Sequence, residues 1–123
     1  MDGKENLVVE KSFDFAVMTV GLCRHLVSEH KEFVLSRQLL KSGTSIGANV
    51  NEVQAAQSKA DFVAKMSIAS KEAREACYWL RLLCESGFLE RKNSQVQSLI
   101  RQSDELTRLL TSIVKTAQTR ARH

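Results

Sequence analysis

Hydrophobic residues recur at alternating intervals of three and four along most of the chain, which is the period of an amphipathic helix. Four stretches carry this pattern, at about residues 12–29, 34–56, 59–86 and 94–119. Short connections between long helices favour antiparallel neighbours. The pattern therefore predicts an all-α fold, an antiparallel up-down-up-down four-helix bundle over residues 12–119, with a flexible segment at 1–11 and a frayed basic C-terminus at 120–123.

The first stretch carries two apolar rows. Ser12 is its predicted N-cap, and the row predicted to face the core is Phe13, Ala16, Val20, Cys23 and Val27. A second row of the first stretch lies beside it and consists of Phe15, Met18, Leu22 and Leu26. The third stretch has an additional row of Ile68, Tyr78, Trp79 and Leu82, and the fourth has one of Ile100, Leu109 and Val114. Because a bundle helix needs one apolar stripe, the extra rows predict self-association. A wide core stripe is the alternative, and it stays open.

The third and fourth stretches show the most regular apolar rows. Their core positions are predicted to be Phe62, Met66, Ala69, Ala73, Ala76, Leu80 and Leu83, then Val96, Leu99, Ser103, Leu106, Leu110, Ile113 and Ala117. Ser58 with Asp61 and Ser94 with Gln97 have the spacing of capping boxes. Gly87 stands where a left-handed glycine ends a helix.

Residues 41–50, KSGTSIGANV, look at first like a phosphate-binding loop. Such a loop needs a lysine after its second glycine and a strand before it, whereas Lys41 precedes both glycines and the helical period continues through the stretch. The stretch is therefore predicted to be the middle of the second helix. Gly43 and Gly47 share one side and cost about 1 kcal/mol each relative to alanine. They predict a close helix approach, with Ala69, Ala73 and Ala76 of the third helix as the partner face.

No constellation of catalytic or metal-binding residues is recognisable in the sequence. The Glu-x-x-His pairs of di-iron bundles and the C-x-x-C of metal sites are absent. Glu72 and Glu75 alternate with Lys71 and Arg74, as on a solvated helix face. We therefore expect a protein that is not an enzyme and that uses no metal or cofactor. Three cysteines without an export signal or a membrane-spanning run predict a cytoplasmic protein.

The net charge of +4 arises entirely after residue 60, and no acid follows Glu105. The basic residues beyond that point are candidates for phosphate contacts: Arg108, Lys115, Arg120 and Arg122. The other interpretation is that these cations complement the C-terminal end of a helix dipole. The charge pattern alone does not separate the two.

Residues 36–83, SRQLLKSGTSIGANVNEVQAAQSKADFVAKMSIASKEAREACYWLRLL, closely resemble a family of small bacterial four-helix-bundle proteins. Founding members of that family are encoded in intervening sequences within large-subunit ribosomal RNA genes, and many carry a ribosomal-protein label. SFDFAVMTV and LTSIVKTAQ extend the resemblance over nearly the whole chain, with mild departures at Asn51 and Val53. The resemblance implies a four-helix bundle that forms a homopentamer and binds nucleic acid. It implies no catalytic residues.

Two functions from different classes remain open on the sequence. The first is a homo-oligomeric module that binds RNA or DNA through a basic surface. The second is a protein-interaction scaffold without a nucleic-acid role, with Tyr78 and Trp79 as contact points.

Overall fold

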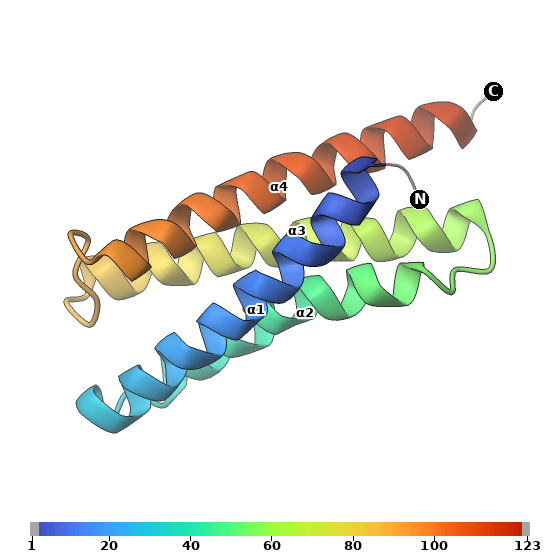
Figure 1. The fold of residues 1–123 in the computed structure, drawn as a ribbon. Coiled ribbons are helices and arrows are strands. Elements are labelled where there is room, and N and C mark those ends of the chain that lie inside the picture. Colours follow the sequence, from blue (N-terminus) through green and yellow to red (C-terminus); the bar gives the residue numbers. More distant parts are fainter. Residues whose placement is uncertain (1–2, 122–123) are drawn as a thin grey trace.

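The computed structural model describes residues 3–121, which form four helices around one core (Figure 1). In chain order they are α1 (Gly3–His30), α2 (Val34–Val53), α3 (Lys59–Glu85) and α4 (Ser94–Ala121). Each helix packs against two neighbours, and the contact between α1 and α4 is the least extensive. The predicted antiparallel four-helix bundle is confirmed.

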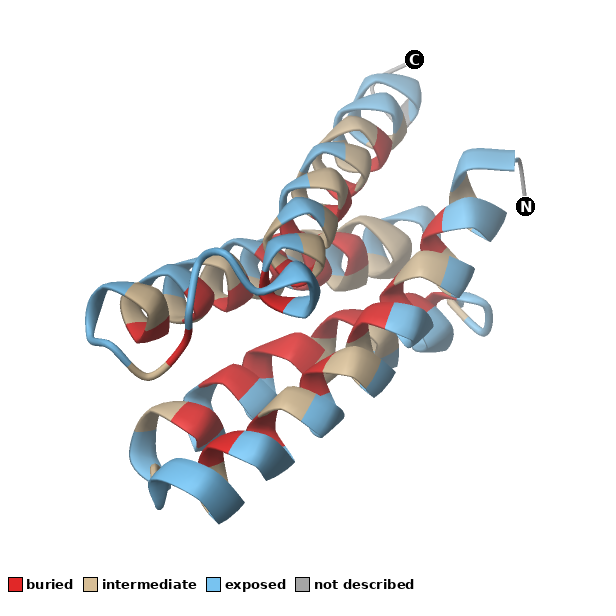
Figure 2. Ribbon diagram, turned by 60° about the vertical axis from the view of Figure 1, so that its left-hand side comes forward, coloured by how far each residue is buried: buried red, intermediate tan, exposed pale blue. Residues whose placement is uncertain are grey.

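The core is formed by one stripe from each helix, and the buried residues lie on the inward sides of all four (Figure 2). In α3 and α4 the buried residues are those of the predicted rows with two exceptions: Phe62 and Ala117 are half-buried, and Ser70, outside the predicted row, is buried. In α2 the apolar positions Leu39, Ile46, Val50 and Val53 are buried at helical spacing, and Ser42 and Gly43 are buried between Leu39 and Ile46. KSGTSIGANV is therefore helical along its whole length, as predicted.

The predicted start of the first helix was wrong. α1 begins at Gly3, so the flexible segment predicted for 1–11 is helical over its described part. The reason is tertiary contact: Val8 is fully buried, and Lys4 Nζ donates to Ser112 Oγ of α4 at 2.9 Å. Ser12, the predicted N-cap, lies inside the helix, where its hydroxyl donates to the Val9 carbonyl.

The predicted core face of α1 was also wrong. Phe15 and Leu26, which were assigned to the second row, are fully buried, whereas Phe13 is 68% exposed and Val20 40% exposed. Cys23 is the residue of the predicted core row that is buried. The face of α1 that is buried in the core carries Ser12 and Thr19 between its apolar residues. Judged from the sequence, it is therefore less hydrophobic than the face that was predicted to be buried.

The seam between α1 and α2 explains this choice of face. An added Cβ at Gly43 would lie 2.7 Å from Thr19 Cγ2, and one at Gly47 would lie 3.4 Å from the Ser12 carbonyl oxygen. Both glycines therefore face α1, and the predicted partner, the alanine face of α3, was wrong. Because the two backbones approach so closely, only small side chains fit between them.

Small polar residues in this seam satisfy their hydrogen bonds locally. Thr19 Oγ1 donates to the Phe15 carbonyl at 2.8 Å, and Ser36 Oγ donates to the Glu32 carbonyl at 2.6 Å. Cys23 Sγ donates across the seam to the Ser36 carbonyl at 3.3 Å. The hydroxyls can therefore be buried without the cost of an unsatisfied polar group.

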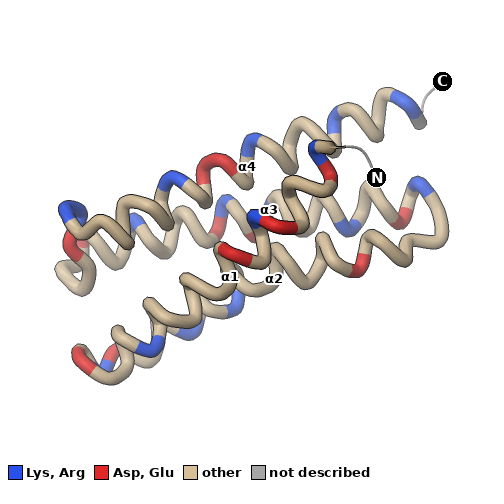
Figure 3. Tube along the Cα trace, viewed as in Figure 1, with Lys and Arg blue, Asp and Glu red and all other residues tan. Residues whose placement is uncertain are grey.

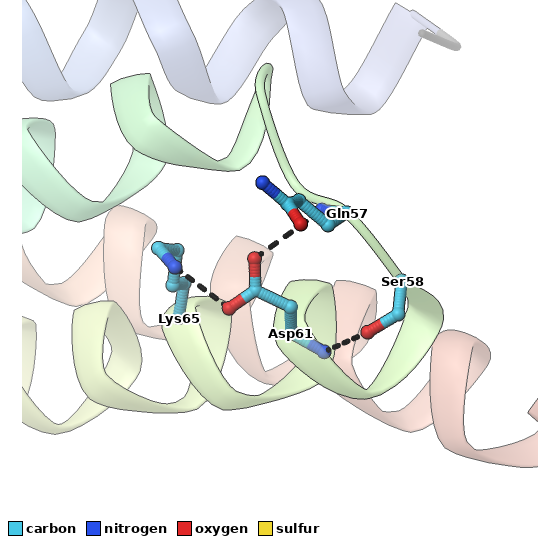
Figure 4. A network of polar contacts seen from close by, with 4 residues as sticks. All are labelled: Gln57, Ser58, Asp61 and Lys65. Carbon is cyan, nitrogen blue, oxygen red and sulfur yellow. Dashed lines mark hydrogen bonds and ion pairs between the residues drawn. The ribbon is translucent and has the colours of Figure 1, made fainter.

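The start of α3 follows the predicted capping chemistry in part (Figure 4). Ser58 Oγ accepts a hydrogen bond from the Asp61 N–H at 3.0 Å. The Asp61 carboxylate accepts from the Gln57 N–H at 3.4 Å and pairs with Lys65 Nζ at 2.7 Å. The hydrogen bond from Lys65 lowers the pKa of Asp61.

The remaining helix ends differ in how the chain leaves or enters them. Gly87, two residues after the end of α3, has a φ of 84° as predicted. Lys31, the residue after the end of α1, takes the same left-handed conformation with a φ of 53°. α4 is capped by Asn93 Oδ1, which accepts from the N–H of Gln95 and Val96, so the predicted capping box of Ser94 and Gln97 was wrong. Asn93 rather than Ser94 caps the helix because its amide oxygen reaches two N–H groups of the first turn that have no partner within the helix.

α2 is shorter than predicted and ends at Val53 rather than at residue 56. In each of the next three residues the N–H donates to the carbonyl three positions earlier in the chain, as the Ala56 N–H does to the Val53 carbonyl at 2.9 Å. Within residues 3–121, no helix combines the length and apolar character needed to cross a membrane.

Candidate nucleic-acid interface

Basic side chains recur along the outer face of α4. Arg101, Arg108 and Lys115 follow one another at intervals of seven residues, and all three are exposed. Seven residues are about two helical turns, or about 10.5 Å along the axis, so these cations share one line on the helix. Figure 3 shows Lys and Arg recurring along α4.

The adjacent face of α3 carries two further exposed arginines at the same interval, Arg74 and Arg81. Two contacts fix the register between the helices: Ser70 Oγ lies 3.3 Å from Thr111 Oγ1, and Cys77 Sγ donates to Asp104 Oδ1 at 3.7 Å. Seven residues toward the C-terminus of α3 therefore correspond to seven residues toward the N-terminus of α4.

In this register Arg74 is level with Arg108, and Arg81 is level with Arg101. The five basic residues are exposed on either side of the seam between α3 and α4, and we call this surface the basic groove: Arg74, Arg81, Arg101, Arg108 and Lys115.

The cations of the basic groove are not neutralised by neighbouring carboxylates. The ion pairs within the described part of the chain involve other lysines and arginines, namely Lys11, Lys65, Lys71 and Arg91. Asp104 lies on the same stripe, held by the Cys77 thiol. Glu105 is turned toward α1, where it pairs with Lys11 at 2.5 Å. The groove therefore presents a surplus of positive charge to solvent.

The predicted phosphate-contact residues divide between this groove and other places. Arg108 and Lys115 line the same shallow depression with Thr111. Arg120 lines a different depression, beside Lys4 of α1 and Phe62 of α3. Arg122 lies outside the described residues.

From the sequence, Arg74 was assigned to a solvated helix face, and Arg81 and Arg101 were not among the candidates for phosphate contact. The shared interval of seven was the signal that could have joined them.

A second surface feature lies on the outer side of α1 and α2. Most of the large hydrophobic residues that are exposed belong to this side, which we call the apolar face: Phe13, Val17, Val20, Phe33, Val34 and Leu40. Two shallow grooves follow the α1–α2 seam there, one lined by Phe13 and Ala48 and the other by Val20 and Phe33. Exposed apolar patches of this kind mark interaction sites.

The third helix carries a smaller exposed aromatic feature. Tyr78 is 58% exposed, and its ring meets the ring of Trp79 edge-on at 5.0 Å. Glu72 precedes Trp79 by seven residues and so lies on the same side of the helix as Trp79. Partial burial and the nearby charge of Glu75 raise the pKa of Glu72.

The cysteines are unpaired and differ in exposure. Cys23 is buried, and that burial raises the pKa of its thiol to about 11. Cys77 and Cys84 are half-exposed. Across residues 3–121, no three His, Cys, Asp or Glu side chains come together as metal ligands.

The chain was compared with known proteins. Residues 4–112 match the model of the 23S rRNA-intervening sequence protein family. A crystal structure of a protein with unknown function from the S23 ribosomal protein family, from Bacteroides thetaiotaomicron, is 51% identical and superposes with a TM-score of 0.86. That alignment covers 91% of this chain and 98% of the other. No curated protein matches the chain. The family match spans most of the sequence and agrees with the four-helix fold, so the chain belongs to the family of 23S rRNA-intervening sequence proteins.

Proposed function

We propose that the protein is a non-enzymatic module that assembles with copies of itself and binds RNA or DNA through a basic surface. The observation that carries the binding part is the basic groove, whose cations have no carboxylate partners in the described chain. The family name adds an association with 23S rRNA, because it ties such proteins to the intervening sequences of that RNA. The unpaired thiols fit action in the reducing cytoplasm.

Self-association is supported by the apolar face. Phe13 is 68% exposed and Val34 is 70% exposed, on a side of the bundle formed by other helices than those of the basic groove. A second copy that covers the apolar face would remove these side chains from water. The assembly would leave the basic groove open and would repeat it on every copy. Five copies are the number that the family resemblance implies.

Light scattering at micromolar concentration tests the assembly. We expect a mass several times 13.8 kDa for the natural chain. A variant with Phe13→Asp and Val20→Asp should be a monomer, because it places two charges in the proposed contact. A control with Gln95→Asp and Gln97→Asp adds the same charge at exposed positions of α4 and should keep the mass of the natural chain. A natural chain that scatters as a monomer would contradict the proposed assembly.

Electrophoretic or fluorescence titration at low and high salt tests nucleic-acid binding by the natural chain. The affinity for the phosphate backbone should fall steeply as the salt concentration rises, because binding releases counterions from the nucleic acid. Absence of any binding at low salt would contradict the proposed function.

A protein scaffold is the second candidate, and the exposed Tyr78 beside Trp79 favours it. Exposed aromatic pairs are typical anchors of protein contacts. A partner captured from a native lysate should then survive nuclease treatment and be lost with Tyr78→Ser. A partner that nuclease releases would favour the nucleic-acid module instead.

A further inference from the structure

The arrangement of cations in the basic groove says more than that the surface is positive. Arg74 and Arg81 form one row on α3, and Arg101, Arg108 and Lys115 form a parallel row on α4. The Ser70–Thr111 and Cys77–Asp104 contacts set the two rows level with each other. The two sides of the groove therefore carry cations at matched heights along its length.

The spacing of these rows fits a phosphodiester backbone. Cations seven residues apart on a helix are separated by about 10.5 Å. A duplex carries one phosphate per about 3.4 Å of axial rise on each strand. Because the strand winds about that axis, the straight rows can follow it only where it faces the protein, and there phosphates lie within reach of cations about 10.5 Å apart. The α4 row from Arg101 to Lys115 spans about 21 Å along the helix.

The side chains between the cations favour recognition of the backbone rather than of bases. The stripe positions facing the groove include Ser70, Cys77, Asp104 and Thr111, none of which is aromatic. Proteins that hold single strands use aromatic rings on which successive bases stack. Trp79 lies outside the stripe of residues 70, 74, 77 and 81 that follows α4. Tyr78 lies beside that stripe, four residues after Arg74 and three before Arg81, but a single ring does not provide the row of aromatic side chains on which successive bases stack.

We infer that the basic groove is the site that binds nucleic acid, and that it holds one phosphate strand of a duplex without reading its sequence. This inference rests on the proposed function and specifies its site and its ligand. It assigns phosphate contacts to Arg74, Arg81 and Arg101 in addition to Arg108 and Lys115. Arg120 has no part in the site, and Asp104 opposes binding by its charge.

The experiment is a salt titration of binding to a 20-base-pair duplex of arbitrary sequence, as DNA and as RNA, and to a single strand of the same length. The test variant combines Arg74→Gln, Arg81→Gln and Arg108→Gln. The control combines Lys31→Gln, Lys59→Gln and Lys92→Gln, which removes the same charge from exposed positions outside the groove. Helical content and assembly mass are measured for each variant, so that a folding defect is recognised.

We expect the test variant to bind more weakly at every salt concentration. The slope of log affinity against log salt should fall by about 3 in magnitude, or about 1 per phosphate contact removed. The control should keep the slope of the natural chain. Asp104→Asn should bind more tightly than the natural chain, since it removes the acid from the groove. The natural chain should prefer duplex to single strand.

The outcomes separate the inference from the proposed function. If the natural chain binds and the test and control variants weaken it equally, the groove is not the site, although the proposed function stands. If the single strand binds more tightly than the duplex, the assignment of a duplex as the ligand is wrong. If the natural chain binds neither, both the inference and the proposed function fail. Equal binding to DNA and RNA duplexes supports recognition of the backbone alone, and a preference for one form identifies which duplex geometry the rows fit.

Discussion

The two halves of the bundle, α1 with α2 and α3 with α4, solve the same packing problem in opposite ways. In α3 and α4 the buried stripe is mostly apolar, with Ser70 and Ser103 as its polar members, and the outer surface carries the cations of the basic groove. In α1 and α2 small polar residues such as Ser12 and Thr19 lie inside, while Phe13 and Val20 are exposed. The difference shows that the separation between two helices can decide which face is buried. Where backbones come close, small size matters more than hydrophobicity.

The strongest test of this contrast uses two phenylalanines of α1. Phe15 is fully buried, so Phe15→Ala should lower the free energy of unfolding by about 3–5 kcal/mol through lost burial and a cavity. Phe13→Ala should change the stability of the isolated chain by less than about 0.5 kcal/mol, as at other exposed positions. Denaturant unfolding over a range of protein concentrations measures both, because assembly makes stability depend on concentration. Equal losses for the two variants would mean that α1 is rotated relative to the structure.

The two glycines of the α1–α2 seam should respond to alanine with opposite signs. Gly43→Ala forces a methyl group against Thr19, and we expect a net loss of about 1–2 kcal/mol after the gain in helix propensity. Gly47→Ala makes only ordinary contact with Ser12, so it should gain about 0.5–1 kcal/mol. Thermal unfolding measures both. Thr19→Ser removes the opposing Cγ2 and should rescue part of the Gly43→Ala loss, and a failure of rescue would place the clash elsewhere.

The two left-handed helix ends should also respond oppositely. Gly87 has a φ of 84° and ends α3, so Gly87→Ala should cost about 1 kcal/mol because a side chain is strained there. Lys31 has a φ of 53° at the end of α1, and Lys31→Gly should gain about 1 kcal/mol by removing that strain. Lys92→Gly, in the connection between α3 and α4, is the control for loss of a lysine. A destabilised Lys31→Gly would show that its hydrogen bond to the Ser28 carbonyl outweighs the strain.

The smallest effect is a pH dependence that comes from a buried thiol of the α1–α2 half. Burial raises the pKa of the Cys23 thiol to about 11, from its ordinary 9.0. Between these values the folded chain keeps a proton that the unfolded chain releases, so this group makes stability fall as pH rises from about 9 to about 11. Cys23→Ala should make that fall shallower. Urea unfolding of the natural chain and the variant at several pH values gives the slopes, and identical slopes in both proteins would exclude the contribution.

The contrast between the halves also marks how far the sequence could predict the fold. The regular rows of α3 and α4 identified their buried residues because large apolar side chains alternate with charge there. In α1 two apolar rows compete, and the choice depends on Gly43 and Gly47, which lie some 30 residues away in the chain. The start of α1 was missed because residues 3–11 are stabilised by contacts with α4 rather than by a cap.

The candidate site was predicted only in part, and for a similar reason. Arg108 and Lys115 were found because the end of the sequence lacks acids. Arg74 lies among acids in the sequence, and only the register between α3 and α4 brings it level with Arg108. Charge counted along a chain does not reveal which side of a helix each charge occupies.

The contact between α1 and α4 joins the two ends of the chain. Lys4 and Ser112 are 2.9 Å apart although 108 residues separate them, and Gly3 and Ala121 lie at one end of the bundle (Figure 1). The connection between α1 and α2 and that between α3 and α4 meet at the opposite end, where the rings of His30 and Phe88 are 6.0 Å apart. The four helices thus close a cycle around the core. A circular permutant that links the ends and opens between α3 and α4 should keep the same neighbours, so the order of the helices in the gene is only one of several that this architecture can accommodate.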